Sequence, residues 1–196
     1  MDDGQSEIKL LLYKQLTENE LKKFVAQSNI TPSGGGARDL RFGAYSSLLP
    51  AIKKMFPTQI KSTLPKTTGK LIYSGELFWR NNNDDIKSGV AHFTPPYPSR
   101  PSEGKISSVD RLGCFDRSLM PHQIDRLNSV LLLLIQLGDG SVWPHYASQK
   151  SLETPGKWHE DIAKILLRGL HSDKLGNRTL TGFKDFVTKD EYCNVR

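Results

Sequence analysis

The segment Asn128-Ser-Val-Leu-Leu-Leu-Leu-Ile-Gln-Leu-Gly-Asp-Gly-Ser-Val-Trp-Pro-His-Tyr-Ala147 decides the fold class. Its apolar part, up to Leu137, predicts a core strand. Gly138-Asp-Gly140 predicts a turn that leads into a second strand from Ser141 to Ala147. The strongly apolar residues, 130–137, are far too few to span a bilayer, so we expect no membrane insertion.

More β structure is predicted on the N-terminal side of this segment. Lys70 to Trp79 and Ile86 to Phe93 flank a polar turn, as the two strands of a hairpin do. Four prolines within Thr94 to Pro101 exclude an interior strand and predict a stiff projecting loop. Lys105 to Val109 and Ile8 to Tyr13 predict two further short strands.

Three helices are predicted between and after these strands. Thr17-Glu-Asn-Glu20 has the pattern of a capping box and predicts a helix to about Gln27. Ser46 to Phe56 predicts a second helix with Pro50 in its first turn. Lys157 to Arg168 has apolar residues at helical spacing and predicts a helix that packs on the β domain or on a following domain. The mixture indicates an α+β, mainly β fold.

The composition changes after Ala147, which predicts a boundary. We expect a β domain over residues 1–150 and a C-terminal helix with a linker or tail over residues 151–196. Neither Cys114 nor Cys193 has metal-ligand spacing, and the chain shows no signal peptide. A reducing, cytoplasmic location is therefore expected.

Positive charge is concentrated in one part of the chain. The net charge is +6 over 196 residues, and residues 31–70 carry seven basic side chains against a single acidic one. Such a concentration is typical of a surface that binds a polyanion, although a solvated lysine-rich face would look the same.

A glycine-rich turn within this basic segment runs from Ser33 to Phe42. The glycines allow positive φ and close approach of the backbone to a partner, and Arg38 and Arg41 could then clamp phosphates or enter a groove. Gly34-Gly-Gly36 lacks the Gly-Lys-Ser/Thr ending of a P-loop, so a nucleotide cradle is disfavoured. A plain surface turn is the remaining alternative.

A second polar loop, from Tyr97 to Ile106, has similar character. Arginine donates to guanine O6 and N7 and glutamate accepts from the cytosine amino group, so Arg100 and Glu103 could read one G·C pair. A solvated salt bridge is the structural alternative. Glu103-Gly-Lys105 is also an acid-x-lysine pattern which, with Asp84 or Asp85 upstream, could hold Mg²⁺ in a small nuclease.

The two loops and the elements between them resemble the N-terminal effector domain of the EcoRII restriction endonuclease family. The resemblance covers roughly residues 25–150 and depends on the order of features: the glycine loop, a helix ending in Phe56-Pro57, two strands, the arm from Arg100 to Ser107, and the leucine-rich strand. It implies a DNA-binding pseudobarrel, an open seven-stranded barrel-like fold shared with plant auxin-response-type DNA-binding domains.

The resemblance also implies how such a domain would act. Two arms, Gly34 to Phe42 and Ser99 to Ile106, would embrace the major groove of double-stranded DNA at a short specific site that contains G·C pairs. The second arm departs from the family pattern in having fewer basic residues, more prolines and about one inserted residue. Together with the charge distribution, this implies DNA contacts at Arg38, Asp39, Arg41, Phe42, Arg80, Ser99, Arg100, Ser102, Glu103, Lys105, Lys53 and Lys54. Lys53, Lys54 and Lys61 are expected to face phosphates and to supply affinity.

The implied role is target recognition in a type II restriction endonuclease of a restriction-modification system. No catalytic or metal-binding residue is expected in this chain, and DNA binding would need no cofactor. Mg²⁺ would be needed only if a nuclease domain were present, and such a domain would follow C-terminal to this chain. A protein-interaction module, with the C-terminal helix docked on a partner, is a further alternative.

Overall fold

The computed structural model describes residues 7–17, 20, 39–63, 68–107, 109–116, 119, 130–176 and 178–195. Its strands are β1 (Ile8–Gln15), β2 (Leu40–Phe42), β3 (Thr58–Lys61), β4 (Leu71–Arg80), β5 (Ile86–Thr94), β6 (Gly104–Ile106), β7 (Val130–Leu137), β8 (Val142–Ser148), β9 (Thr181–Asp185) and β10 (Glu191–Cys193). Its helices are α2 (Tyr45–Met55), α3 (Gln149–Glu153) and α4 (Glu160–Leu170), with short 3-10 helices η1 (Val109–Arg111) and η2 (Gly113–Phe115).

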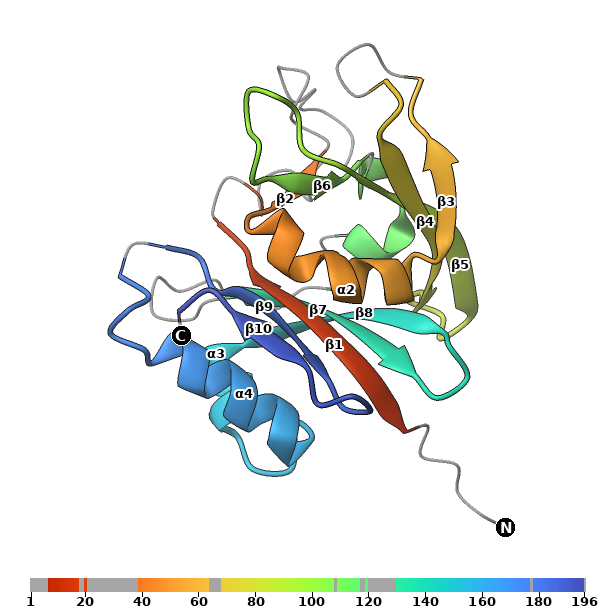
Figure 1. Cartoon of the computed structure of the whole chain (residues 1–196). Helices are drawn as coiled ribbons and strands as arrows, with labels where there is room; N and C mark the ends of the chain where they lie inside the picture. Colours follow the sequence, from red (N-terminus) through yellow and green to blue (C-terminus); the bar gives the residue numbers. More distant parts are fainter. Residues whose placement is uncertain are drawn as a thin grey trace.

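All ten of these strands belong to one sheet. Its order is β10-β9-β1-β7-β8-β4-β5-β6-β2, and β3 pairs with β4 beside this path. The sheet curls into a half-barrel whose hollow holds α2 (Figure 1). The chain is therefore mainly β with few helices, as the sequence predicts.

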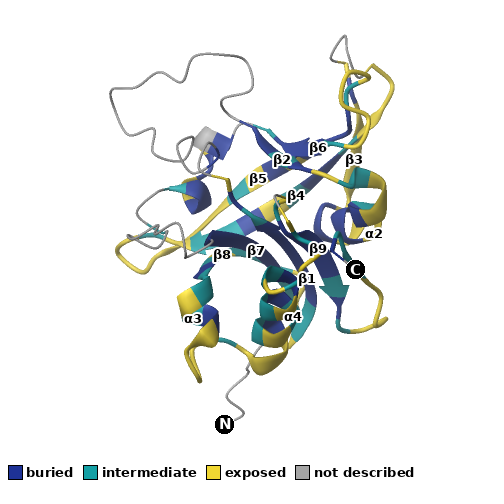
Figure 2. Cartoon of the chain, turned by 90° about the vertical axis from the view of Figure 1, so that its left-hand side faces the viewer, coloured by how far each residue is buried: buried dark blue, intermediate teal, exposed yellow. Residues whose placement is uncertain are grey.

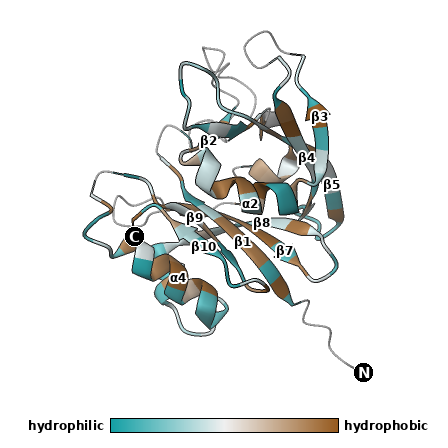
Figure 3. Cartoon of the chain, viewed as in Figure 1, coloured by the Kyte–Doolittle hydropathy of each residue, from teal (hydrophilic) through white to brown (hydrophobic). Residues whose placement is uncertain are grey.

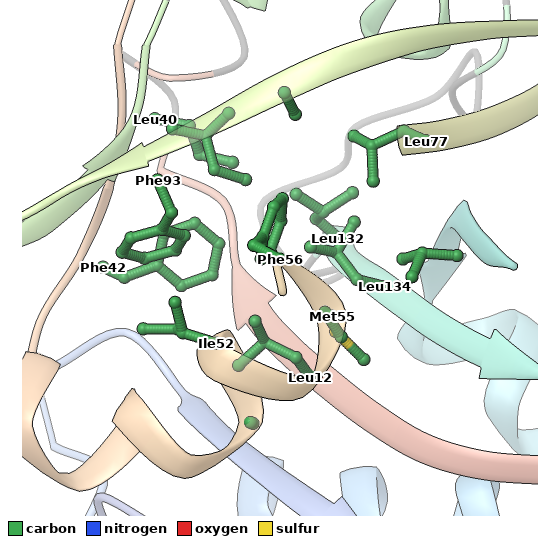
Figure 4. Close-up of a cluster of buried hydrophobic side chains, with 14 of the residues drawn as sticks. Leu12, Leu40, Phe42, Ile52, Met55, Phe56, Leu77, Phe93, Leu132 and Leu134 are labelled. Atoms are coloured by element: carbon green, nitrogen blue, oxygen red, sulfur yellow. The ribbon is translucent and has the colours of Figure 1, made fainter. Parts of the chain in front are cut away.

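Helix α2 supplies the centre of the main core. Its buried side chains include Leu48, Ile52 and Met55, and they belong to one cluster with residues from both halves of the curled sheet. Figure 4 shows Ile52 and Met55 beside Leu12 of β1 and Leu134 of β7. The helix faces inward on these residues because their spacing places them on one side of it.

Strand β7 is buried on both faces. Leu132 and Leu134 lie in the cluster around α2, whereas Leu131 and Leu133 lie in a second cluster with Ile162 and other residues of α4. Figure 3 shows hydrophobic residues along β1 and β7, and Figures 1 and 2 place α2 and α4 on opposite sides of these strands. Two-sided burial explains why the leucine run is continuous and does not alternate.

The predicted hairpin is present, and it belongs to the half of the sheet that carries the arms. Strands β4 and β5 pair from Tyr73↔Phe93 to Arg80↔Ile86. Among the described residues, the pairing between this half and the half containing β1 and β7 consists of one parallel bridge, Leu77↔Val142. Packing around α2, more than ladder hydrogen bonds, therefore holds the two halves together.

Several predicted helical features need correction or lie outside the described residues. The capping box is confirmed, because Glu20 N donates to Thr17 Oγ1 (3.2 Å) and Thr17 N donates to Glu20 Oε2 (3.0 Å). The rest of that predicted helix, to Gln27, lies outside the described residues. Pro50 lies in the second turn of α2, not the first, because the helix already begins at Tyr45.

The C-terminal segment contributes more than a helix. Strand β9 pairs with β1 and β10 pairs with β9, although the sequence analysis predicts no strand after Ala147. Strand β3 is also unforeseen. The apolar face of α4 packs on Leu11, Leu133 and Leu180 of this same chain, so the structure gives that face an internal partner.

Candidate nucleic-acid interface

The two predicted arms end in neighbouring strands. Strands β2 and β6 pair antiparallel in the register Leu40↔Ile106, Arg41↔Lys105 and Phe42↔Gly104. The last residues of the first arm thus lie against the last residues of the second, which the sequence alone does not reveal. Gly34 to Gly36 and Arg38 lie outside the described residues.

One face of this short ladder belongs to the core. Phe42 is 1% exposed, and its ring lies 5.3 Å from that of Phe93, centroid to centroid (Figure 4). Leu40 and Ile106 are buried in the same cluster. Phe42 therefore anchors the arm in the core, and the prediction that it contacts DNA is not supported by its position.

Gly104 lets the second arm lie close to the core. A Cβ at this position would overlap the rings of Tyr45 and Phe93. Burial, with a smaller contribution from Tyr73, raises the pKa of Tyr45 to about 12, so its phenol is neutral at physiological pH. Gly104 of the second arm thus packs on an uncharged site formed by Tyr45 and Phe93.

The opposite face of the ladder carries four charged residues. Arg41 and Lys105 are directly opposite, and Asp39 and Glu103 precede them by two residues, so all four side chains share a face. Lys105 Nζ lies 2.6 Å from Asp39 Oδ2, with 11% and 8% of the respective side chains exposed. The same ammonium lies 4.8 Å from the ring centroid of Tyr97. Lys105 and Asp39 are therefore buried within the arms rather than presented to a ligand.

Glu103 joins the arms at the surface. Its Oε2 lies 3.1 Å from Nη1 of Arg100 and 3.5 Å from Nη1 of Arg41, which belongs to the other arm. Half of the Arg100 side chain is exposed, and about a third of Glu103 and Arg41. The arrangement presents two guanidinium groups and one carboxylate together, which are the groups that recognise phosphates and base edges.

The loop that carries Arg100 is held at both of its ends. Arg100 N donates to Tyr97 O (2.9 Å), and Tyr45 N donates to Ser102 O (2.9 Å). Lys70 Nζ donates to Pro96 O (2.8 Å) and so connects the loop to the neighbouring end of β4. Ser99 and Ser102 are exposed along the loop, where a ligand could reach their hydroxyls.

The predicted lysines of α2 do not join this surface. Lys53 and Lys54 lie in the last turn of the helix, roughly 12 Å along its axis from Tyr45, which touches the arm. Lys54 Nζ forms an ion pair with Oδ2 of Asp185 in β9, whose carboxylate is buried. Lys54 thus ties α2 to the C-terminal strands. Lys53 is exposed.

Arg80 is also distant from the arms. It lies at the far end of the β4–β5 hairpin, seven residue pairs from Tyr73↔Phe93 and thus roughly 23 Å along the strands. There its guanidinium pairs with Asp84 (3.3 Å). Asp84 and Asp85 are equally far from Glu103, so the acids of the predicted nuclease pattern do not converge.

Charge is distributed differently at the end of the sheet that bears the arms and at the far end of the β4–β5 hairpin. Among the described residues, those of the two arms and the adjoining ends of β3 and β4 include a surplus of positive charge: Arg41, Lys61, Lys70, Arg100 and Lys105 against Asp39 and Glu103, a net +3. At the far end of the hairpin, Arg80 and Lys87 are balanced by Asp84 and Asp85. Lys61, which the sequence analysis expects to face phosphate, lies opposite Leu71 at this end of the sheet. Lys70 was not predicted as a site residue, because its proximity to the arms depends on strand pairing.

The chain matches no protein-family model, no curated protein and no solved structure. Within the described part of the chain, no group of three or more His, Cys, Asp or Glu side chains could hold a metal ion. Helices long and apolar enough to cross a membrane are likewise missing from the residues described.

Proposed function

We propose that this chain recognises double-stranded DNA at a specific sequence, through the two arms that meet at β2 and β6. The observation that carries the proposal is the exposed cluster in which Arg41 of one arm and Arg100 of the other share the carboxylate of Glu103. Arginine forks and a carboxylate are the side chains that discriminate G·C pairs in the major groove.

The position of the cluster supports this function over non-specific binding of anions. The arms lie at the end of the molecule with a net positive charge, which favours approach of a polyanion. The cluster itself contains an acid, and a carboxylate repels phosphate while accepting from a base amino group. A surface built only for phosphate would gain from the absence of Glu103.

The resemblance to the EcoRII effector domain extends the proposal. On this view the half-barrel is a DNA-binding pseudobarrel, the chain reads the target of a type II restriction endonuclease in the cytoplasm, and a nuclease domain elsewhere makes the cut. No cofactor would then be required for binding. The separation of Asp84 and Asp85 from Glu103 favours this division of labour over a metal-dependent nuclease within the chain.

The test is a selection of bound duplexes from a random pool in the presence of EDTA, followed by addition of Mg²⁺. We expect one short preferred sequence that contains G·C pairs and remains uncut by this chain. Arg100→Ala and Glu103→Ala should each relax the preference at a base pair by about 1–3 kcal/mol.

Arg80→Ala is the matched control, because Arg80 is an exposed arginine in an ion pair at the far end of the hairpin. It should leave the preferred sequence unchanged. Equal binding to all sequences by the unmodified chain would contradict the proposed specificity. Cleavage with Mg²⁺ that Glu103→Ala abolishes would replace the proposal with the nuclease.

A further inference from the structure

The arms meet through an unusually short ladder. Strands β2 and β6 have three residues each and pair at three positions. Because side chains alternate between the faces of a strand, a shift of one residue would move Arg41 to the core side and Phe42 to the solvent side. Something besides three backbone pairs has to define the register of such a ladder.

The buried ion pair lies diagonally across this ladder. Lys105 is opposite Arg41, yet its ammonium contacts Asp39, two residues earlier in the chain, at 2.6 Å. Arg41 and Glu103 form the second diagonal, at 3.5 Å, on the exposed side. A shift of one residue would place the partners of each diagonal on opposite faces of the ladder. Of the two ion pairs, only the one between Lys105 and Asp39 is withdrawn from water.

A buried ion pair is a poor source of stability, because removing two charges from water offsets most of their attraction. Its stronger effect is on alternative registers, because a register that separates the two residues leaves the buried Lys105 ammonium without the Asp39 carboxylate. The Tyr97 ring above the ammonium adds a second constraint from the loop that carries Arg100. The ion pair between Asp39 and Lys105 therefore favours the observed register of β2 and β6 over a register shifted by one residue.

We infer that Asp39 and Lys105 are positioning residues: their buried ion pair sets the register of β2 against β6 and thereby holds Arg41 and Arg100 at the separation that reads the DNA site. Neither residue contacts the base in this scheme. The inference rests on the proposed function. It changes the role of Asp39 and Lys105 from direct contact with DNA to positioning of Arg41 and Arg100.

The test replaces the pair by apolar side chains of similar length, Asp39→Leu with Lys105→Met. We expect a folded protein that melts close to the parent, because the desolvation of two charges is removed together with their attraction. Its ratio of specific to non-specific binding should fall roughly tenfold or more, while the salt dependence of non-specific binding stays the same. Lys105→Arg, which keeps the charge, should retain most of the ratio.

Lys54→Met is the matched control, because it removes an ion pair to a buried carboxylate away from the arms. It should lower stability and leave the specificity ratio intact. If the apolar pair does not fold, Asp39→Asn with Lys105→Gln, a neutral pair that can still hydrogen-bond, is measured in its place with the same expected loss.

The possible outcomes separate the two proposals. An unmodified chain without sequence preference would contradict the proposed function itself. A specific parent whose double variants keep the full specificity ratio would overturn only the positioning role of Asp39 and Lys105. A lower ratio in Lys54→Met, equal to that of the double variants, would show that loss of stability alone explains the effect, and would also overturn the role.

Discussion

Gly104 shows how a single residue sets the depth of the second arm. The backbone passes so close to Tyr45 and Phe93 that no side chain fits between them. Gly104 also pairs with Phe42, whose ring occupies the adjacent part of the core. The absence of a side chain at one position is therefore what allows the neighbouring residues of the arm to lie at the surface of the half-barrel.

Gly104→Ala should destabilise the protein by about 1–3 kcal/mol, because the added methyl group forces two buried rings to move. Urea unfolding followed by tryptophan fluorescence would measure the loss. Gly43→Ala is the control, since a Cβ there meets nothing within 4 Å. Equal stability of the two variants would show that the rings near Gly104 yield without cost.

The residues of the candidate site could be predicted only in part. The spacing of Arg100 and Glu103 allows a salt bridge, which is the structural alternative to their predicted role in reading a G·C pair, and the two side chains do pair at 3.1 Å. The participation of Arg41 and the burial of Lys105 depend on partners 62 and 66 residues away. No local pattern records such contacts, so Lys105 was expected to contact DNA, whereas its side chain is buried against Asp39.

At the scale of elements, strands with strong apolar patterns were predicted and weak ones were not. The hairpin of β4 and β5 and the pair β7 and β8 follow their predicted bounds within two residues at either end. Strand β3, Thr58–Lys61, is exposed along its whole length, and β9 and β10 include several polar residues. These segments are strands because β3 pairs with β4, β9 with β1 and β10 with β9, and their composition does not predict these pairings.

The contact between α2 and β9 predicts a response to acid. Burial opposes ionisation of Asp185, but hydrogen bonds from Lys54 and from the backbone N–H groups of Thr188 and Val187 outweigh burial and hold its pKa below the ordinary value. A carboxyl with a lowered pKa stabilises the fold above its unfolded pKa of about 3.9 and loses that contribution as the pH falls through the folded pKa.

The free energy of unfolding should therefore decrease below about pH 4, and Asp185→Asn should show a smaller decrease over the same interval. At neutral pH the substitution should cost about 1–3 kcal/mol, the range for weakening hydrogen bonds at a buried polar group. Denaturant titrations at several pH values measure both quantities. Asp84→Asn, at a carboxylate whose side chain is 83% exposed, should behave like the parent. An identical acid response in Asp185→Asn would contradict this account.

At the scale of the whole molecule, the described residues form a positive group at the arms and a balanced group at the far end of the β4–β5 hairpin. The order of strands places β6 and β2 at one limit of the sheet, next to β5, and Lys70, just before β4, reaches the same side through its hydrogen bond to Pro96. This arrangement brings together Arg41, Lys61, Lys70 and the loop that carries Arg100, which are separate in the sequence. The sequence predicts the excess of charge in residues 31–70, but not that the two arms and Lys70 meet at one place.

Lys61→Ala should weaken binding to every duplex and reduce the slope of log K against log salt by about one unit, if a phosphate lies over this end of the molecule. Fluorescence anisotropy with a non-specific duplex over a series of salt concentrations measures the slope. Lys87→Ala removes an exposed lysine at the far end of the hairpin and should leave the slope unchanged. Equal slopes for Lys61→Ala and Lys87→Ala would contradict a phosphate contact at Lys61.

Because β7 is buried on both faces, its residues can change less during evolution than the exposed residues of the loop around Arg100. From Val130 to Ile135 every position faces one core or the other, so only apolar residues are tolerated there. Ser99, Arg100 and Ser102 carry no such restriction, because their side chains are exposed. Descendants of this chain could thus keep an unchanged scaffold and acquire new binding preferences through a few loop residues.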